Sequence, residues 1–177
     1  MYKYLFGEFL TNVTTTIGTS LNSKQVEFFG KKIAVRLWDP AGTERYHAVL
    51  LSLFRDAHAA IMVYDVGSQS SFENLGFWLQ EIENNCETHV VKVLVANKTD
   101  QVHRSVSKED GKERAKSLGI PYMETSAKDG DNVDAVFETV MYKALQNPDL
   151  CRVEGRNAIT LEAQPEEESR PWYKRWC

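Results

Sequence analysis

Apolar positions along this chain switch repeatedly between a two-residue spacing and a helical spacing. Ile33, Val35 and Leu37 fall on every second position, which predicts a strand with one buried face. Residues 59–65 and 90–97 are short, nearly continuous apolar runs. Such runs are typical of strands that are covered on both faces.

Two helical patterns lie after these runs. The first is predicted to begin at a capping box of Ser70 and Glu73. The second is predicted to begin at Ser107 with Asp110 and to stop at Gly119. The expected buried face of the first helix consists of Leu75, Trp78, Leu79, Ile82 and Cys86.

A third helical pattern starts after Asp131 or Asn132, either of which is a suitable N-cap. Strands that alternate with helices predict an α/β fold with a parallel sheet, in which ligands bind at the carboxyl ends of the strands. The apolar pattern stops near residue 147, so we expect one domain over 1–146 and a flexible tail over 147–177. The expected buried face of the third helix consists of Val133, Val136, Phe137, Val140 and Ala144.

Composition narrows the class of protein. The net charge of −4 argues against nucleic acid as a partner. Apolar runs are all shorter than the roughly 18 to 20 residues that a membrane span needs. Three widely spaced cysteines favour reduced thiols in the cytosol. We therefore expect a cytoplasmic globular domain. We also expect it to be a monomer.

Asn97 to Asp100 (NKTD) follow a predicted strand directly. A carboxylate such as that of Asp100 can accept two hydrogen bonds side by side, and guanine, unlike adenine, offers two adjacent donors. Asn97 can brace the loop and reach the base, and the stem of Lys98 can lie across one face of the ring. Alone, this short motif fits a capped surface turn equally well.

A second motif, Glu124 to Lys128 (ETSAK), follows the last predicted strand and includes Ser126. The backbone N–H of Ala127 can meet the guanine oxygen, and Lys128 can cover the other face of the base. Two base-reading motifs, each placed after a strand, favour guanine binding over two unrelated turns.

With these motifs, residues 1–146 resemble Rab-type small GTPases. Residues 14–18 (TTTIG), 38–46 (WDPAGTERY) and 63–66 (VYDV) have counterparts in that family. Residues 119–133 look most like the branch that serves regulated secretory granules, and the branch of the endoplasmic reticulum and lipid droplets is second.

The resemblance implies a P-loop NTPase-like α/β fold, with a doubly wound and mostly parallel sheet that lacks its first strand, its P-loop and part of its first helix. It also implies GTP and GDP as ligands, Mg²⁺ as cofactor, and a role as a switch in vesicle traffic and exocytosis. Rab effectors and exchange factors would bind the switch segments, and the tail would attach to vesicles or other intracellular membranes.

By position in the family's motifs, Thr16 would bind Mg²⁺ through its hydroxyl and Asp39 would bind it through water. The N–H of Gly42 would donate to the γ-phosphate. Both segments would be released when that phosphate is lost. Trp38, next to Asp39, is expected to be a core residue at a strand end.

One departure from the family is that no G-x-x-x-x-G-K-[ST] motif occurs in these residues. That loop supplies backbone N–H groups and a lysine to the phosphates and a hydroxyl to Mg²⁺. Its absence predicts GTP binding weakened by about seven decades, or roughly 10 kcal/mol. The strand before it lies inside the sheet, so we expect two strands with unpaired edges.

Two explanations of this departure stay open. The chain is either a truncated form of a full GTPase, which we favour because both base-reading motifs are intact, or a pseudo-GTPase that binds Rab effectors without nucleotide.

Two further departures affect hydrolysis and membrane attachment. Thr43 stands where the family has the glutamine that orients the attacking water, so GTP hydrolysis should be slow. Pro40 replaces a threonine and removes one backbone N–H. Cys177 is a single C-terminal cysteine where Rabs usually carry two. One prenyl chain anchors a protein only marginally, and an unmodified thiol is equally compatible with the sequence.

Overall fold

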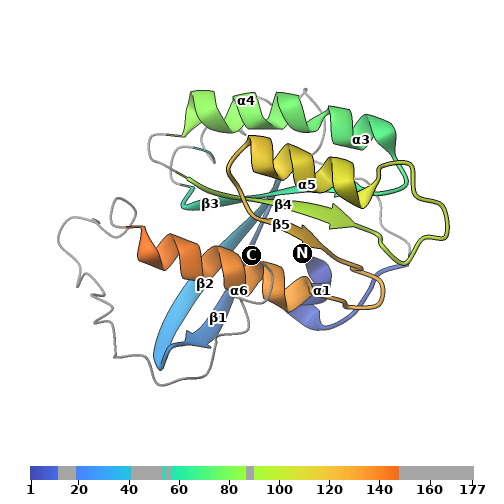
Figure 1. Ribbon diagram of the computed structural model, residues 1–177. Coiled ribbons are helices and arrows are strands. Elements are labelled where there is room, and N and C mark those ends of the chain that lie inside the picture. The colour runs from blue at the N-terminus through green and yellow to red at the C-terminus, as the bar shows by residue number, and fades with distance from the viewer. Residues whose placement is uncertain (12–18, 41–53, 55–56, 87–89, 148–177) are drawn as a thin grey trace, which may run out of the picture.

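Five strands of the described chain divide into two sheets (Figure 1). Strands β3 (Ala59–Asp65), β4 (Val91–Asn97) and β5 (Tyr122–Glu124) form a parallel sheet in the order β3-β4-β5. Strands β1 (Thr19–Phe28) and β2 (Lys31–Pro40) form an antiparallel hairpin. This architecture confirms the predicted α/β class. The computed structural model describes residues 1–11, 19–40, 54, 57–86 and 90–147.

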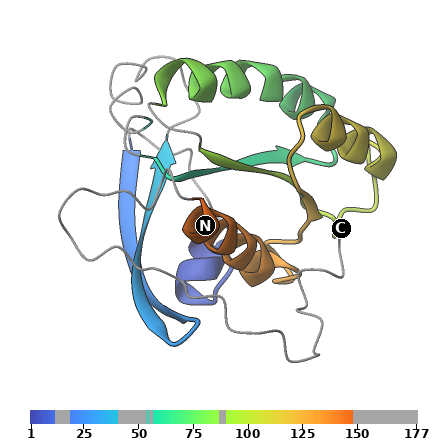
Figure 2. The same ribbon diagram turned by 60° about the vertical axis from the view of Figure 1, so that its left-hand side comes forward.

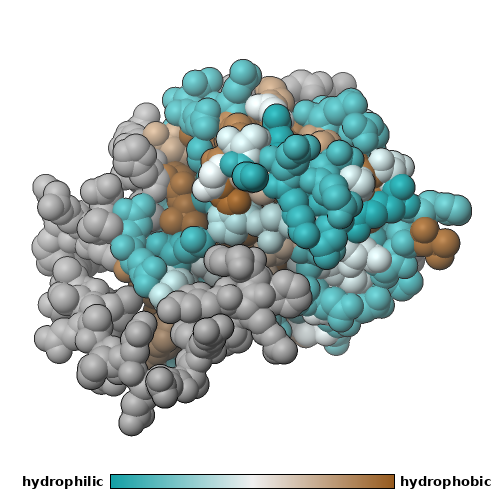
Figure 3. Space-filling view, in the orientation of Figure 1, coloured by the Kyte–Doolittle hydropathy of each residue, from teal (hydrophilic) through white to brown (hydrophobic). Residues whose placement is uncertain are grey.

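Helices cover both faces of the parallel sheet, as Figures 1 and 2 show. Helix α3 (Gln69–Glu73), helix α4 (Leu75–Asn85) and helix α5 (Lys108–Ser117) lie on one face, over a core cluster that includes buried residues of β3 and β4. Helix α6 (Val133–Gln146) lies on the other face, and the short helix α1 (Tyr2–Phe6) packs beside it. Over α4 and α5 the surface is mostly hydrophilic (Figure 3), as expected of amphipathic helices. None of the helices described is long and apolar enough to cross a bilayer.

The buried strand β4 and its neighbour β3 differ in how well they are covered. Val93, Leu94 and Ala96 of β4 are completely buried, which confirms the prediction of coverage on both faces. The same prediction is wrong for part of β3, because Val63 is 51% exposed. Among the described residues β3 pairs only with β4, and β2 pairs only with β1. The expected unpaired edges are therefore present in the described part of the chain.

In β2 the predicted alternation is confirmed, since Ile33, Val35 and Leu37 all lie on the half-buried face. Asp39 continues this inward face. The expectation that Trp38 is a core residue is wrong: its side chain is 46% exposed. Successive residues of a strand point to opposite faces, so the residue after Leu37 must face outward.

The start of the first predicted helix is also corrected. The N-cap of α3 is Ser68, whose hydroxyl accepts a hydrogen bond from the backbone N–H of Ser71 at 3.3 Å. Ser70 therefore lies inside the helix, and it forms no capping box with Glu73. The helical pattern also breaks at Asn74, which separates α3 from α4. The predicted buried face is confirmed, because its five residues are all buried or half-buried.

The two later helices show one confirmed cap and one corrected cap. Ser107 and Asp110 form the predicted capping box of α5, and Gly119 follows its end with φ +65°. Asn132 occupies the N-cap position of α6 but makes no capping hydrogen bond. Its side-chain amide donates instead to the backbone carbonyl of Glu124 at 2.9 Å. The predicted buried face of α6 is confirmed.

Gly111 allows α5 to approach the sheet closely. A Cβ atom at this position would lie 2.7 Å from Cε2 and 2.9 Å from Oη of Tyr122, and closer still to Oη of the buried Tyr64. We expect Gly111→Ala to lower the free energy of unfolding by about 1 to 2 kcal/mol, because overpacking outweighs the gain in helix propensity.

Urea denaturation followed by circular dichroism measures this effect. Gly76→Ala in α4 is the matched control, because a Cβ at Gly76 would meet nothing closer than 3.6 Å. This variant should raise the free energy of unfolding by about 0.5 to 1 kcal/mol. If both variants were stabilised, the close approach at Gly111 would be excluded as the reason for this glycine.

Candidate nucleotide-binding site

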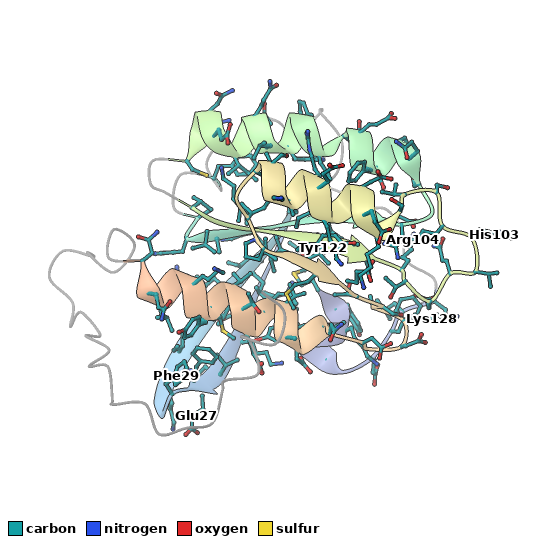
Figure 4. The ribbon with its side chains drawn as sticks, viewed as in Figure 1. Glu27, Phe29, His103, Arg104, Tyr122 and Lys128 are labelled. Carbon is teal, nitrogen blue, oxygen red and sulfur yellow. The ribbon has the colours of Figure 1, made fainter. Side chains whose placement is uncertain are left out.

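Both base-reading motifs lie at the carboxyl end of the parallel sheet. We call residues 98–106, which follow β4, the first base loop, and residues 125–131, which follow β5, the second base loop. Because the two strands are parallel neighbours, their loops emerge side by side. Figure 4 shows Arg104 of the first loop and Lys128 of the second at this end of the sheet. The expected juxtaposition of the two motifs is present.

Asn97 joins the two loops. Its side-chain oxygen accepts a hydrogen bond from the Thr125 hydroxyl at 3.0 Å and from the backbone N–H of Ala127 at 3.1 Å. The backbone N–H and the hydroxyl of Thr99 both donate to the carbonyl of Thr125, at 3.1 and 3.0 Å. Asn97 therefore braces the loops in the manner its position predicts. The Ala127 N–H, which we expect to meet the guanine oxygen, is engaged by Asn97 here.

The carboxylate of Asp100 has a fixed orientation. Its Oδ1 accepts from the hydroxyl of Ser126 at 2.8 Å, and its Oδ2 lies 3.8 Å from Nζ of Lys128. Ser126 is buried and the Asp100 side chain is only 14% exposed. Carboxylate oxygens have further lone pairs, so Asp100 can accept the two adjacent donors of guanine while Ser126 holds it in place.

Lys98 forms an ion pair with Asp65, the last residue of the neighbouring strand β3. Its backbone is left-handed, with φ +66°, and its Nζ lies 2.6 Å from Oδ2 of Asp65. Burial raises the pKa of the Asp65 carboxyl, but the hydrogen bonds from Lys98 and the Gly67 N–H outweigh burial and leave that pKa below its usual range. The Lys98 side chain remains 54% exposed, so its stem is accessible to a base.

Several polar residues of this site were not predicted by the sequence analysis. Asp65 ends β3, and Arg104 and Lys108 reach the site from the chain after β4. Glu124 belongs to the second motif, although the motif suggests no role for it. A charged residue at the end of an apolar strand, as at Asp65, is the sequence signal that could have indicated this edge of the sheet.

Of the residues expected on the phosphate side of the site, the structure describes Asp39. Thr16, Gly42 and Thr43, like the tail residue Cys177, lie outside the described residues. Asp39 is the next-to-last residue of β2. No cluster of three or more histidine, cysteine or carboxylate side chains suited to a metal occurs in the described part of the chain. The donor and acceptor set of the base loops fits guanine, and Asp39 is the described carboxylate expected to hold Mg²⁺.

Comparison with known proteins gives matches to Ras-related and GTP-binding proteins. The sequence profile of the Ras family matches residues 1–146. The chain is 43% identical over 141 residues to "Ras-related protein RABA5b" of Arabidopsis thaliana, and 41% identical over 142 residues to "Ras-related protein Rab-26" of Homo sapiens. It is 38% identical over 142 residues to "GTP-binding protein ypt3" of Schizosaccharomyces pombe.

These matches cover about four fifths of this chain but less of each relative. They span 79% of the chain and 65% of the Arabidopsis protein, 79% and 56% for the human protein, and 80% and 66% for the yeast protein. The chain therefore spans less than two thirds of the length of these relatives.

Proposed function

Because this chain belongs to the Ras family, as a Rab-type small GTPase, we propose that it acts as a guanine-nucleotide switch in vesicle traffic and exocytosis. The observation that carries the proposal is the Asp100 carboxylate, which Ser126 orients beside the Asn97 bridge between the loops. The yeast relative is itself called a GTP-binding protein.

Base recognition proceeds from these contacts. The two oxygens of Asp100 accept the ring N–H and the exocyclic amine of guanine. The Ala127 N–H turns from Asn97, or is shared with it, to donate to the guanine oxygen. The stems of Lys98 and Lys128 cover the two faces of the ring. Adenine has neither the paired donors nor the oxygen, so the site discriminates by leaving its polar groups unpaired with the wrong base.

The switch depends on the phosphate side of the site. Mg²⁺, when bound, neutralises phosphate charge, and Thr16 and Asp39 are the residues that would hold it. The Gly42 N–H would sense the γ-phosphate. Loss of that phosphate would release both switch segments, and partners that read these segments would dissociate.

One surface of the described chain suits such partners. Leu21 of β1 and Trp38 of β2 are cross-strand neighbours and are 50% and 46% exposed. In sequence, Leu21 follows TTTIG closely and Trp38 begins WDPAGTERY, the two segments that would change with nucleotide. An exposed apolar pair favours protein contact, which supports effectors and exchange factors as partners. The same pair supports the alternative, a scaffold that binds effectors without nucleotide. Membrane attachment would use the tail, with Cys177 as the site of prenylation.

Isothermal titration of residues 1–177 with GTP and with ATP, each with Mg²⁺, tests the proposal. We expect GTP to bind no more tightly than the high micromolar range, because these residues contain no phosphate-loop motif. We expect ATP to bind at least about tenfold more weakly, because it cannot pair with Asp100.

Three outcomes separate the alternatives. A submicromolar dissociation constant for GTP would contradict the weakened phosphate site. Equal affinities for GTP and ATP would contradict the base assignment. No binding of either nucleotide would favour the scaffold.

A further inference from the structure

Glu124 connects the two base loops through charge. The residue ends β5 and leads directly into the second base loop. Its Oε1 accepts hydrogen bonds from Nη2 of Arg104 at 2.5 Å and from the hydroxyl of Tyr122 at 3.0 Å, and its Oε2 lies 2.9 Å from Nζ of Lys108. Arg104 belongs to the first base loop. We call these four residues the Glu124 cluster.

The cluster is anchored on several elements. Nε of Arg104 donates to the carbonyl of Val106 at 2.6 Å, which fixes the guanidinium at the end of the first base loop. The Tyr122 hydroxyl lies 3.5 Å from that of the buried Tyr64 in β3. Nη2 of Arg104 also donates to the Tyr122 hydroxyl at 3.4 Å, and both residues are labelled in Figure 4. The cluster therefore ties both loops to the rigid core below them.

The Glu124 carboxylate is the charge of the cluster that is best shielded from water, whereas the Lys108 side chain is 45% exposed. The side chains of Glu124 and Arg104 are 20% and 30% exposed. Burial raises the pKa of Glu124, but hydrogen bonds from Lys108, Arg104 and Tyr122 outweigh it and leave that pKa below its usual range. Burial, the Tyr64 hydroxyl and the Glu124 charge raise the pKa of Tyr122, so its phenol stays a donor. A partly buried ion pair of this kind is costly to break on one side only.

Above this cluster lie the contacts that shape the base site. Two backbone N–H groups donate hydrogen bonds from one loop region to the other. The N–H of Ala127 donates to the side chain of Asn97, and the N–H of Thr99 donates to the Thr125 carbonyl. Neither contact involves a charged side chain, and each depends on the distance between the loops. Beside these direct contacts, Arg104 of the first base loop and Lys108 of α5 form ion pairs with Glu124, the residue that precedes the second base loop.

We propose that Arg104, through Glu124, holds the two base loops at the separation that guanine requires, and is thus a positioning residue for base recognition. This inference rests on the proposed guanine binding. Arg104 itself does not touch the base. Its removal would let the first base loop move relative to the second, so that Asp100 and the Ala127 N–H no longer meet one ring together.

Amide hydrogen exchange measured by NMR on the full chain tests the proposal without any nucleotide. In Arg104→Met we expect the protection of the Ala127 and Thr99 amides to fall at least about tenfold. The amide of Leu94, which donates to Pro121 in the strand ladder at 2.9 Å, should keep its protection. Lys112→Met is the matched control, because Lys112 is exposed on α5 and should change none of the three.

Two results would overturn the positioning role. Unchanged protection at Ala127 and Thr99 would show that the loops do not depend on Arg104. An equal loss at all three amides would show that Arg104 merely stabilises the fold. If Arg104→Met does not fold, Glu124→Gln removes the charge, keeps the side-chain shape, and gives the same comparison.

A guanosine titration followed by NMR shifts separates this proposal from the proposed function. Guanosine should shift the amides of both base loops in the unmodified chain, and Arg104→Met should weaken this binding about tenfold with little change for Lys112→Met. An unmodified chain whose loop amides do not respond to guanosine would contradict guanine recognition, while the exchange data would still decide whether Arg104 sets the loop separation. Unchanged guanosine affinity in Arg104→Met would overturn the positioning role.

Discussion

The substitution Asp100→Asn is expected to move the base preference of this protein from guanine towards xanthine by roughly 1 to 3 kcal/mol, or about 5- to 150-fold. Asn replaces one acceptor oxygen of Asp100 by a donor. Guanine then presents a donor to a donor, whereas the second oxygen of xanthine accepts from the new amide. The hydroxyl of Ser126 can still donate to the remaining oxygen, so the side chain should keep its orientation.

Competition between GDP and xanthosine diphosphate, each titrated in the same buffer, measures this ratio independently of how strongly the phosphates bind. Asp129→Asn is the matched control, because Asp129 is an exposed carboxylate of the second base loop. It makes the same change of charge and should leave the ratio unaltered. If Asp100→Asn keeps the preference for guanine, Asp100 does not read the base.

The base side of the site could be predicted from sequence because its parts are short, contiguous and placed directly after strands. Asn97, Asp100 and Ser126 come together through the parallel pairing of β4 with β5, and a parallel sheet is what the alternation of strands and helices predicts. Asp65 and Arg104 could not be assigned in this way. Their partners, Lys98 and Glu124, are distant in sequence, and only the tertiary structure brings each pair within contact.

Two details of the fold, the N-cap of α3 and the burial of Val63, differ from what the hydrophobic pattern predicts. Ser68, Ser70 and Ser71 are all suitable caps, and the sequence does not show which hydroxyl finds an orphan N–H. In the structure Ser71 is occupied, since its hydroxyl donates to the Ser68 carbonyl at 2.8 Å, and Ser68 becomes the cap. The sequence predicts that Val63 is a core residue because β3 is apolar over most of its length. Its exposure depends on which strands flank β3, and that is a property of the whole sheet.

For hydrolysis, in a protein whose residues 1–177 are preceded by a phosphate-binding strand and loop, Thr43→Gln is expected to raise the single-turnover rate of GTP cleavage by about tenfold or more, which corresponds to a barrier lower by at least ~1.4 kcal/mol. Thr43 stands in WDPAGTERY where the related family has glutamine. The threonine side chain is too short to touch both the attacking water and the transition state, and it lacks the paired donor and acceptor of an amide. Pro40, with its fixed φ, limits how far the backbone can adapt to shorten that distance.

The measurement uses protein in excess over trace GTP, at protein concentrations above the dissociation constant, so that weak binding does not mask the chemical step. Thr43→Val is the control: it has the shape of threonine without the hydroxyl, and it should leave the slow rate unchanged if the hydroxyl does not position water. A rate that falls in Thr43→Val would assign the water to the hydroxyl itself. If the rate stays the same in Thr43→Gln, residue 43 does not lie next to the attacking water, because a glutamine within reach of that water would lower the barrier.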